Sequence, residues 1–175
     1  RGSKVCEVRI VADIQSAIVE ALNALREKYD FVFTTGGIGP THDDITADAV
    51  AAAFGRGIDV RADARALLAA HYAARGTELT EARLRMARIP EGARLIDNPV
   101  STAPGFTLEN CHVMAGVPEV FQAMVAGLLP GLRGGAPLFS RRPLAISNVV
   151  CSLTAPNAAS VSGFTPQYFT FASLA

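Results

Sequence analysis

The amino-acid sequence predicts a three-layer α/β fold with a mainly parallel sheet. Residues 31–34 (FVFT) form a short, continuously apolar run, which is typical of a strand in a sheet covered by helices on both faces. Strand-like and helix-like patterns alternate over the first 55 residues, as expected of parallel strands joined by helices. Half of the 175 residues are apolar, which is enough for the core of one domain.

The first two elements are predicted to be a strand and a helix. Residues 5–11 alternate in polarity and are rich in valine and isoleucine, which favours a strand. Asp13 is predicted to cap the following helix, because its carboxylate can accept the free N–H groups of the first turn. The apolar residues of this helix recur at helical spacing and define one buried face: Ile14, Ala17, Ile18, Ala21, Leu22 and Leu25.

Three further helices are predicted in the middle of the chain. Thr46 is expected to cap a helix over residues 47–54. Residues 63–76, rich in alanine and leucine, predict a second helix that ends at a glycine. Residues 80–89 predict a third, which stops at Pro90.

The second half is predicted to complete the sheet and add one more helix. A strand is expected at residues 94–96, then a hairpin of residues 106–108 and 112–114, then a helix over 119–128. These elements give a domain of residues 1–132. Residues 133–175 are predicted to be a linker and a tail of unassigned role.

Composition limits the classes of function. Sixteen basic and sixteen acidic side chains balance, so the sequence predicts neither a nucleic-acid-binding surface nor a membrane-binding one. The three cysteines are far apart and favour neither disulfides nor a zinc site, which indicates a reducing compartment. No apolar run reaches the roughly 20 residues that span a bilayer. A cytoplasmic protein is expected, and a small neutral or locally anionic ligand remains open.

The stretch after the apolar strand, TTGGIGPTHDD (residues 34–44), is the predicted ligand site. Gly36, Gly37 and Gly39 follow the carboxyl end of a strand, where glycines let the backbone approach a phosphate closely. The spacing GGxG matches neither the dinucleotide fingerprint nor the P-loop. Asp43 and Asp44 would repel a bare phosphate, so they are predicted to hold a Mg²⁺ ion that the phosphate also contacts.

Threonine hydroxyls around this stretch are further candidates for ligand binding: Thr35, Thr41 and Thr46. The alternative for the whole stretch is purely structural. Glycines also make tight turns, and aspartates stabilise helix N-termini without any ligand.

Three segments in order carry a resemblance to a known family. These segments are TTGGIGPTHDDITADAVAAAFG (34–55), NPVSTAPGF (98–106) and AGVPEVFQAM (115–124). They resemble the molybdopterin-binding domain shared by the MoaB/Mog proteins, the gephyrin G domain, CinA and the N-terminal domain of FAD synthase. The GGIGPTHDD form is most similar to the last two.

This resemblance implies a molybdopterin-binding α/β domain that forms homo-oligomers, dimers or trimers, and holds the pterin phosphate or a nucleotide around the glycine loop. It implies that Asp44 acts in Mg-dependent chemistry and that Asp13 also matches a functional aspartate. In the CinA-like branch it implies a metal-dependent pyrophosphatase for ADP-ribose or FAD. The family begins with a strand and a helix whose patterns are not found here, so this first strand and helix are expected to be absent.

Topology and resemblance together predict that Asn98, Ser101 and Gly105 line the pocket beside the glycine loop, because polar loops at one sheet edge bind ligands. The residues leave open three activities. These are binding without turnover, transfer of an adenylyl group, and hydrolysis of a nucleotide pyrophosphate.

Overall fold

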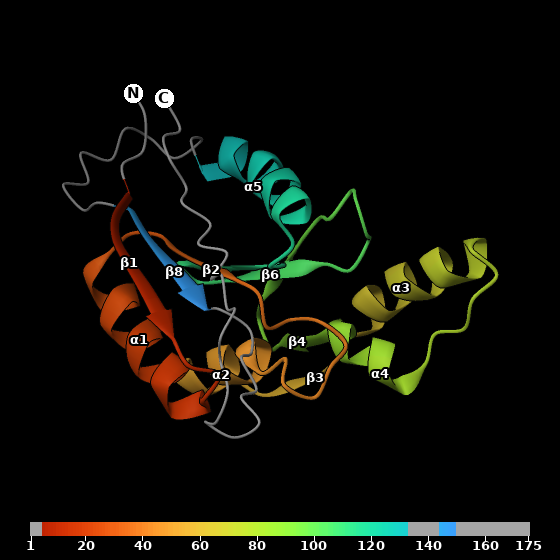
Figure 1. Ribbon diagram of the computed structural model, residues 1–175, viewed down its shortest axis with the longest axis horizontal. Coiled ribbons are helices and arrows are strands. Elements are labelled where there is room, and N and C mark those ends of the chain that lie inside the picture. Colours follow the sequence, from red (N-terminus) through yellow and green to blue (C-terminus); the bar gives the residue numbers. More distant parts are fainter. Residues whose placement is uncertain (1–4, 133–143, 150–175) are drawn as a thin grey trace, which may run out of the picture.

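The computed structural model describes residues 5–132 and 144–149, which form an α/β fold around one main sheet (Figure 1). The six strands of this sheet lie in the order β1-β8-β2-β7-β6-β5. Their bounds are Val5–Val11 (β1), Leu144–Val149 (β8), Val32–Thr35 (β2), Cys111–Met114 (β7), Gly105–Leu108 (β6) and Arg94–Ile96 (β5). The pairs among β1, β8, β2 and β7 are parallel, whereas β6 pairs antiparallel with both of its neighbours.

Helices cover both faces of the sheet, which confirms the predicted fold class. The helices α1 (Gln15–Lys28) and α2 (Thr46–Ala53) share one hydrophobic core with strand side chains such as Val32. The helix α5 (Pro118–Leu132) packs in a second cluster with the next residue of β2, Phe33. Because successive side chains of a strand point to opposite faces, the apolar run of β2 serves both cores at once.

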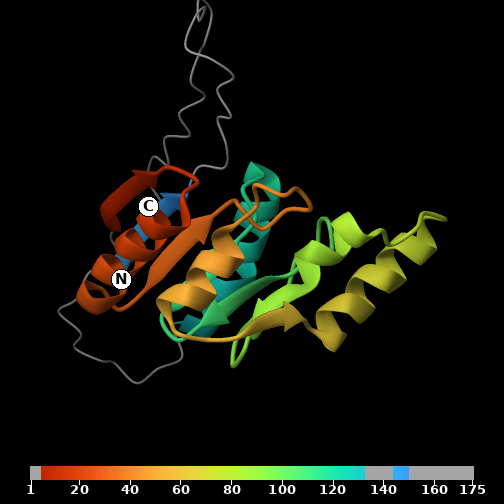
Figure 2. The ribbon, with the colours of Figure 1, turned by 90° about the horizontal axis from the view of Figure 1, so that it is seen from below.

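A smaller unit extends from one end of the sheet, as Figure 2 shows on the right. It consists of a two-stranded antiparallel ribbon, β3 (Ile58–Val60) with β4 (Arg88–Pro90), the helix α3 (Ala62–Ala74), and a short helix α4 (Glu81–Leu84) that continues as one 3-10 turn, Arg85–Ala87. The ribbon was not predicted from the sequence. Three-residue strands give too short a pattern to separate from the flanking helices.

Two predicted helix caps are wrong. The N-cap residue of α1 is Ile14, with no side-chain cap, so Asp13 lies one position too early. The N-cap residue of α2 is Ile45, also without a side-chain cap, and Thr46 is the first helical residue. Thr80 does cap a helix, α4, since its hydroxyl accepts a hydrogen bond from the backbone N–H of Arg83 at 3.4 Å.

The helix predicted over residues 80–89 is shorter than expected. It ends at Leu84, and residues 88–90 leave the helical path to pair with β3. By contrast, the hairpin of β6 and β7 is confirmed, and α5 begins one residue earlier than predicted and continues through Pro130. Tertiary pairing with β3 therefore overrode the local helical preference of the 80–89 segment.

No strand was predicted after residue 132, yet β8 lies between β1 and β2 and pairs with both. Residues 133–143 and 150–175, predicted to be linker and tail, lie outside the described residues. Within the described chain, no helix is both long and apolar enough to cross a membrane.

Candidate functional site

The glycine loop lies at the carboxyl edge of the parallel part of the sheet. Strand β2 ends at Thr35 and leads directly into Gly36, and the neighbouring parallel strand β7 ends at Met114. In sheets of this kind, ligands bind beyond the carboxyl ends of the strands. The fold therefore places the predicted loop where ligand sites of α/β proteins occur.

Contacts with the segment after β7 hold the start of this loop. The backbone N–H of Gly36 donates to the carbonyl of Met114 at 2.9 Å, and the hydroxyl of Thr35 donates to the carbonyl of Ala115 at 3.0 Å. Gly116 packs so closely that a β-carbon on it would lie 3.0 Å from the α-carbon of Gly36. The Thr35 hydroxyl and the Gly36 amide are thus used in bracing the loop.

The next residues need glycine. Gly36 and Gly37 have φ angles of 92° and 68°, a region that side chains other than glycine seldom adopt. A β-carbon on Gly37 would collide with the hydroxyl of Thr46, and the Thr46 backbone N–H donates to the Gly37 carbonyl at 2.9 Å. Thr46 is fully buried and thus fixes the start of α2 against the loop.

The middle of the loop presents consecutive backbone donors. The amides of Gly37, Ile38 and Gly39 make no hydrogen bond with any other described residue. Successive N–H groups in turn conformations form concavities that bind anions.

Asp44 folds back over the loop. Its Oδ2 accepts hydrogen bonds from the backbone N–H of Thr41 at 2.9 Å and from the Thr41 hydroxyl at 2.5 Å. A β-carbon on Gly39 would lie 2.6 Å from the same oxygen. The Asp44 carboxylate is therefore fixed against the glycine backbone, with Asp43 beside it in the chain and half-buried.

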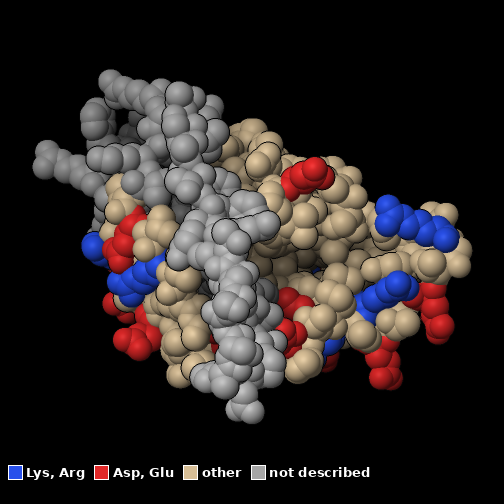
Figure 3. Space-filling view, viewed as in Figure 1, with Lys and Arg blue, Asp and Glu red and all other residues tan. Residues whose placement is uncertain are grey.

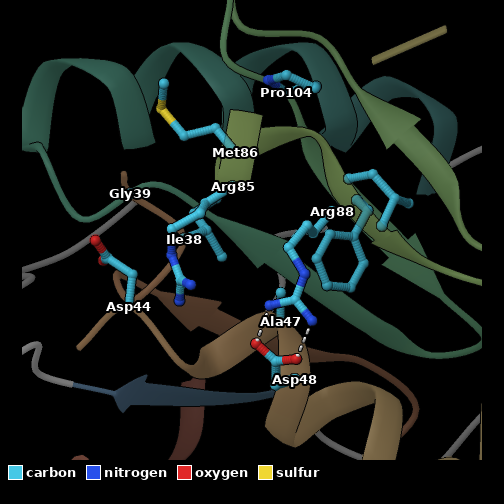
Figure 4. Close-up of a pocket in the computed structure, with 11 residues that line it drawn as sticks. Ile38, Gly39, Asp44, Ala47, Asp48, Arg85, Met86, Arg88 and Pro104 are labelled. Atoms are coloured by element: carbon cyan, nitrogen blue, oxygen red, sulfur yellow. Dashed lines mark hydrogen bonds and ion pairs between the residues drawn. The ribbon is translucent and has the colours of Figure 1, made fainter. Parts of the chain in front are cut away.

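A narrow pocket separates the glycine loop from the segment that ends in β4 (Figure 4). Its volume is about 10 Å³, which is room for about one water molecule. The Arg88 guanidinium forms a two-point ion pair with Asp48 at 2.7 and 2.6 Å, and Arg85 Nε donates to the Thr41 carbonyl at 3.0 Å. The pocket is lined by Ile38, Gly39, Asp44, Ala47, Asp48, Arg85, Met86, Arg88, Ile89, Pro104 and Phe106.

The predicted loop of residues 98–104 is organised by Asn98. Its amide group donates to the Ser101 hydroxyl at 2.6 Å and to the Ala103 carbonyl at 2.8 Å, and its oxygen accepts from the backbone N–H groups of Val100 and Ser101. Asn98 is buried, with 6% of its surface exposed. Asn98 and Ser101 thus bind each other and the loop backbone.

An open cavity of about 260 Å³ lies against this loop and shares Pro104 with the narrow pocket. Thr102, on its wall, has a φ angle of 66°, a strained value for a β-branched residue. The Thr102 hydroxyl lies 2.8 Å from Nδ1 of His71 on α3. Loop 98–104 is thus tied to the smaller unit.

Gly105, predicted to line the pocket, follows this loop as the first residue of β6. A β-carbon on it would meet the Val113 carbonyl and would lie 2.5 Å from the Met124 methyl group. In the structure Gly105 therefore packs closely between β7 and α5.

The structure thus brings together most of the predicted loop residues, from Thr35 to Asp44, and places Asp13 just after the carboxyl end of β1. Among the described residues, no group of three or more His, Cys, Asp or Glu side chains has the arrangement of a metal site. Asp48, Arg85 and Arg88 were not predicted as site residues. The only signal for the two arginines was a basic cluster at residues 83–88, which is also typical of an exposed helix.

Charge on the face seen in Figure 3 is spread out. Lys and Arg side chains lie apart on it, and acidic side chains border a hollow near its middle.

The mainly parallel sheet, with a braced glycine loop at its carboxyl edge, defines an α/β protein of the class in which ligand sites commonly occur at that edge. Within this class, residues 1–134 match the family described as a probable molybdopterin binding domain. The chain belongs to this family.

Relatives place the chain in the CinA-type branch. A CinA-like protein of Geobacter sp. (strain M21) is 40% identical over 78% of this chain, and a CinA-like protein of Myxococcus xanthus is 35% identical over 75%. The crystal structure of CinA from Thermoplasma acidophilum, described as of unknown function, superposes with a TM-score of 0.62 at 33% identity, covering 69% of this chain and 73% of that chain.

A relative from Pyrobaculum calidifontis is 37% identical over 89% of this chain. The chain spans 62% of the length of that relative and 34% of the Geobacter protein.

Proposed function

We propose that the glycine loop binds the phosphate of a pterin such as molybdopterin, or of a nucleotide, together with Mg²⁺ held by Asp43 and Asp44. The observation that carries this proposal is the set of three consecutive amides, residues 37–39, in a loop whose flanks are fixed. Donors that are held in place before the ligand arrives bind it without a further ordering cost.

The two aspartates suit a Mg²⁺ ion that is bound together with a phosphate ligand. Mg²⁺ commonly binds one or two carboxylates and completes its shell with water and phosphate oxygens. Asp43 and Asp44 are adjacent, and Thr41 fixes one oxygen of Asp44. When bound, the ion would supply positive charge to the phosphate oxygens.

A second candidate function is hydrolysis of a nucleotide pyrophosphate at the same loop, favoured by the fixed Asp44 carboxylate beside the amides. In that reaction a water oxygen bonds to phosphorus, the bond from phosphorus to the bridging oxygen breaks, and two phosphate products leave with release of a proton. The amides of residues 37–39 would stabilise charge on the reacting phosphate.

One experiment separates these functions. The protein is incubated with ADP-ribose, FAD and ATP, with and without Mg²⁺, and AMP release is followed by chromatography, while molybdopterin binding is measured on the same samples. If hydrolysis occurs, we expect Asp44→Asn and Asp43→Asn to lower metal-dependent AMP release at least about a hundred-fold while the fold persists.

Asp59→Asn is the matched control, because Asp59 is exposed on β3 and its carboxylate accepts only from the amide of Val60 among the described residues. Binding without AMP release would support the binding function alone. Failure to bind any of these compounds would contradict the proposal.

A further inference from the structure

Two arginines face the glycine loop across the narrow pocket, and they differ in what they already bind. Both terminal nitrogens of Arg88 already form an ion pair with Asp48. Arg85 is held by Nε alone, which donates to the Thr41 carbonyl. Its two terminal Nη groups make no hydrogen bond with any described residue.

Arg85 is placed to reach the loop. It is half-buried, it lines the pocket with Gly39 and Asp44, and Figure 4 shows both arginine side chains directed from the 85–88 segment toward the wall formed by the loop and α2. The bond from Nε to Thr41 fixes the direction of the guanidinium plane. A fixed guanidinium presents its two terminal nitrogens as a planar fork, the geometry that matches two oxygens of one phosphate.

The charges around the loop give a reason for this cation. Asp43 and Asp44 lie beside a loop that would hold a dianionic phosphate. The two positive charges of the proposed Mg²⁺ match these two carboxylates, which leaves the charge of the phosphate itself for a further cation to offset. Asp48 adds no net negative charge, because Arg88 pairs with it.

We propose that Arg85 is a phosphate-binding residue, whose Nη groups donate to the same phosphate that the amides of residues 37–39 bind. This inference rests on the proposed function, and it defines the ligand as a phosphate ester or a pyrophosphate. The anion site then has two sides, with the backbone donors of the glycine loop on one and the Arg85 cation on the other. The narrow pocket has room for only about one water molecule, so the phosphate would lie outside it.

The test measures affinity by isothermal titration calorimetry for three compounds: inorganic pyrophosphate, ADP-ribose and, as the ligand without phosphate, adenosine. The proteins are the wild type, Arg85→Gln, Arg85→Lys and Arg65→Gln. Arg65 is an exposed residue of α3 whose side chain makes no hydrogen bond or ion pair with the described residues, so its variant removes one positive charge elsewhere. Unfolding temperatures of all four proteins are measured alongside.

We expect Arg85→Gln to weaken pyrophosphate and ADP-ribose about ten- to a hundred-fold, as for loss of a charged hydrogen bond. Arg85→Lys cannot reproduce the Nε contact but keeps the charge, so recovery of part of the affinity would identify the charge, and not the positioning of Thr41, as the cause. Arg65→Gln should bind as the wild type does.

Two results would overturn the inference. If the wild type binds the phosphate compounds and Arg85→Gln binds them equally well, Arg85 has no role and the proposed function stands. If the wild type binds none of them, the proposed function fails as well.

Discussion

Two polar loops border the pocket, and the structure holds them in different ways. The glycine loop is held mainly from outside, by β7 at Gly36 and by Arg85 at Thr41, and Asp44 adds contacts to Thr41 within the loop. The loop of residues 98–104 is held mainly from inside, by the four hydrogen bonds of Asn98, with one contact to α3 through Thr102.

The difference indicates which loop can take a ligand without reorganising. A loop braced by its neighbours keeps its own amides for binding, as residues 37–39 do. A side chain such as Asn98, whose donors and acceptor are already paired, would have to give up buried hydrogen bonds to bind a ligand. Asn98 therefore shapes the loop that lines the open cavity, and the glycine loop supplies the donors.

The largest effect is expected from Gly37→Ala. The positive φ angle costs a side chain about 1–2 kcal/mol, and the collision with Thr46 adds about 1–3 kcal/mol, as for overpacked cores. We expect the free energy of unfolding to fall by about 3 kcal/mol and phosphate binding to be lost, measured by urea denaturation and calorimetry.

Gly76→Ala is the matched control, because Gly76 also has a positive φ angle, 64°, but no atom lies within 4 Å of the added methyl group. Gly76→Ala should lose only the stability that the positive φ angle costs, about 1–2 kcal/mol, and should bind ligand normally. Equal losses in the two variants would show that packing on Thr46 does not shape the glycine loop.

An effect of similar size is expected from acid, which acts on β7, the strand that braces the glycine loop. His112 of β7 is buried, lies 4.9 Å from the Phe33 ring, and its Nδ1 is 2.9 Å from the Thr107 hydroxyl. Burial, together with the charge of Arg94, lowers the pKa of His112 from 6.5 to about 4.

Since the unfolded chain binds this proton first, stability is fully present above pH 6.5 and falls as the pH drops toward 4. The loss attributable to His112 is about 3 kcal/mol. The free energy of unfolding is measured by urea denaturation at each pH, and we expect His112→Gln to lack this loss. His42 is an exposed loop histidine, so His42→Gln should behave as the wild type. Parallel curves for wild type and His112→Gln between pH 6.5 and 4 would contradict the assignment.

The smallest effects are expected inside the second loop. Asn98→Ala removes four hydrogen bonds and should destabilise the protein by about 2 kcal/mol, and Ser101→Ala, which removes one, by about 1 kcal/mol. Affinity for pyrophosphate should change little in Ser101→Ala. A large loss of affinity in that variant, with stability unchanged, would show that Ser101 contacts the ligand directly.

Much of the fold could be predicted because its signals are local. The apolar run of β2, the helical spacing of α1 and the β6–β7 hairpin each depend on residues close together in the chain. The ribbon of β3 and β4 could not be predicted in this way. It joins residues about 30 positions apart, and each strand is only three residues long.

The position of β8 is also a long-range property. Residues 144–149 lie between two strands from the first 35 residues of the chain, and no local pattern states which strands a segment will join. The two wrong cap predictions have a local cause instead. Asp13 and Thr46 are residue types that favour caps, but the backbone enters each helix one position away from where the side chain could cap it.

The sequence by itself determined the class of fold, the family and the glycine loop, because glycine spacing and hydrophobic period are read directly from neighbouring residues. Only the tertiary structure decided which polar groups of the site are already paired. Asn98 is engaged within its own loop, Arg88 is engaged by Asp48, and Arg85 reaches the glycine loop from 44 residues away. Pairing of this kind depends on distances between atoms of separate segments, which folding alone sets.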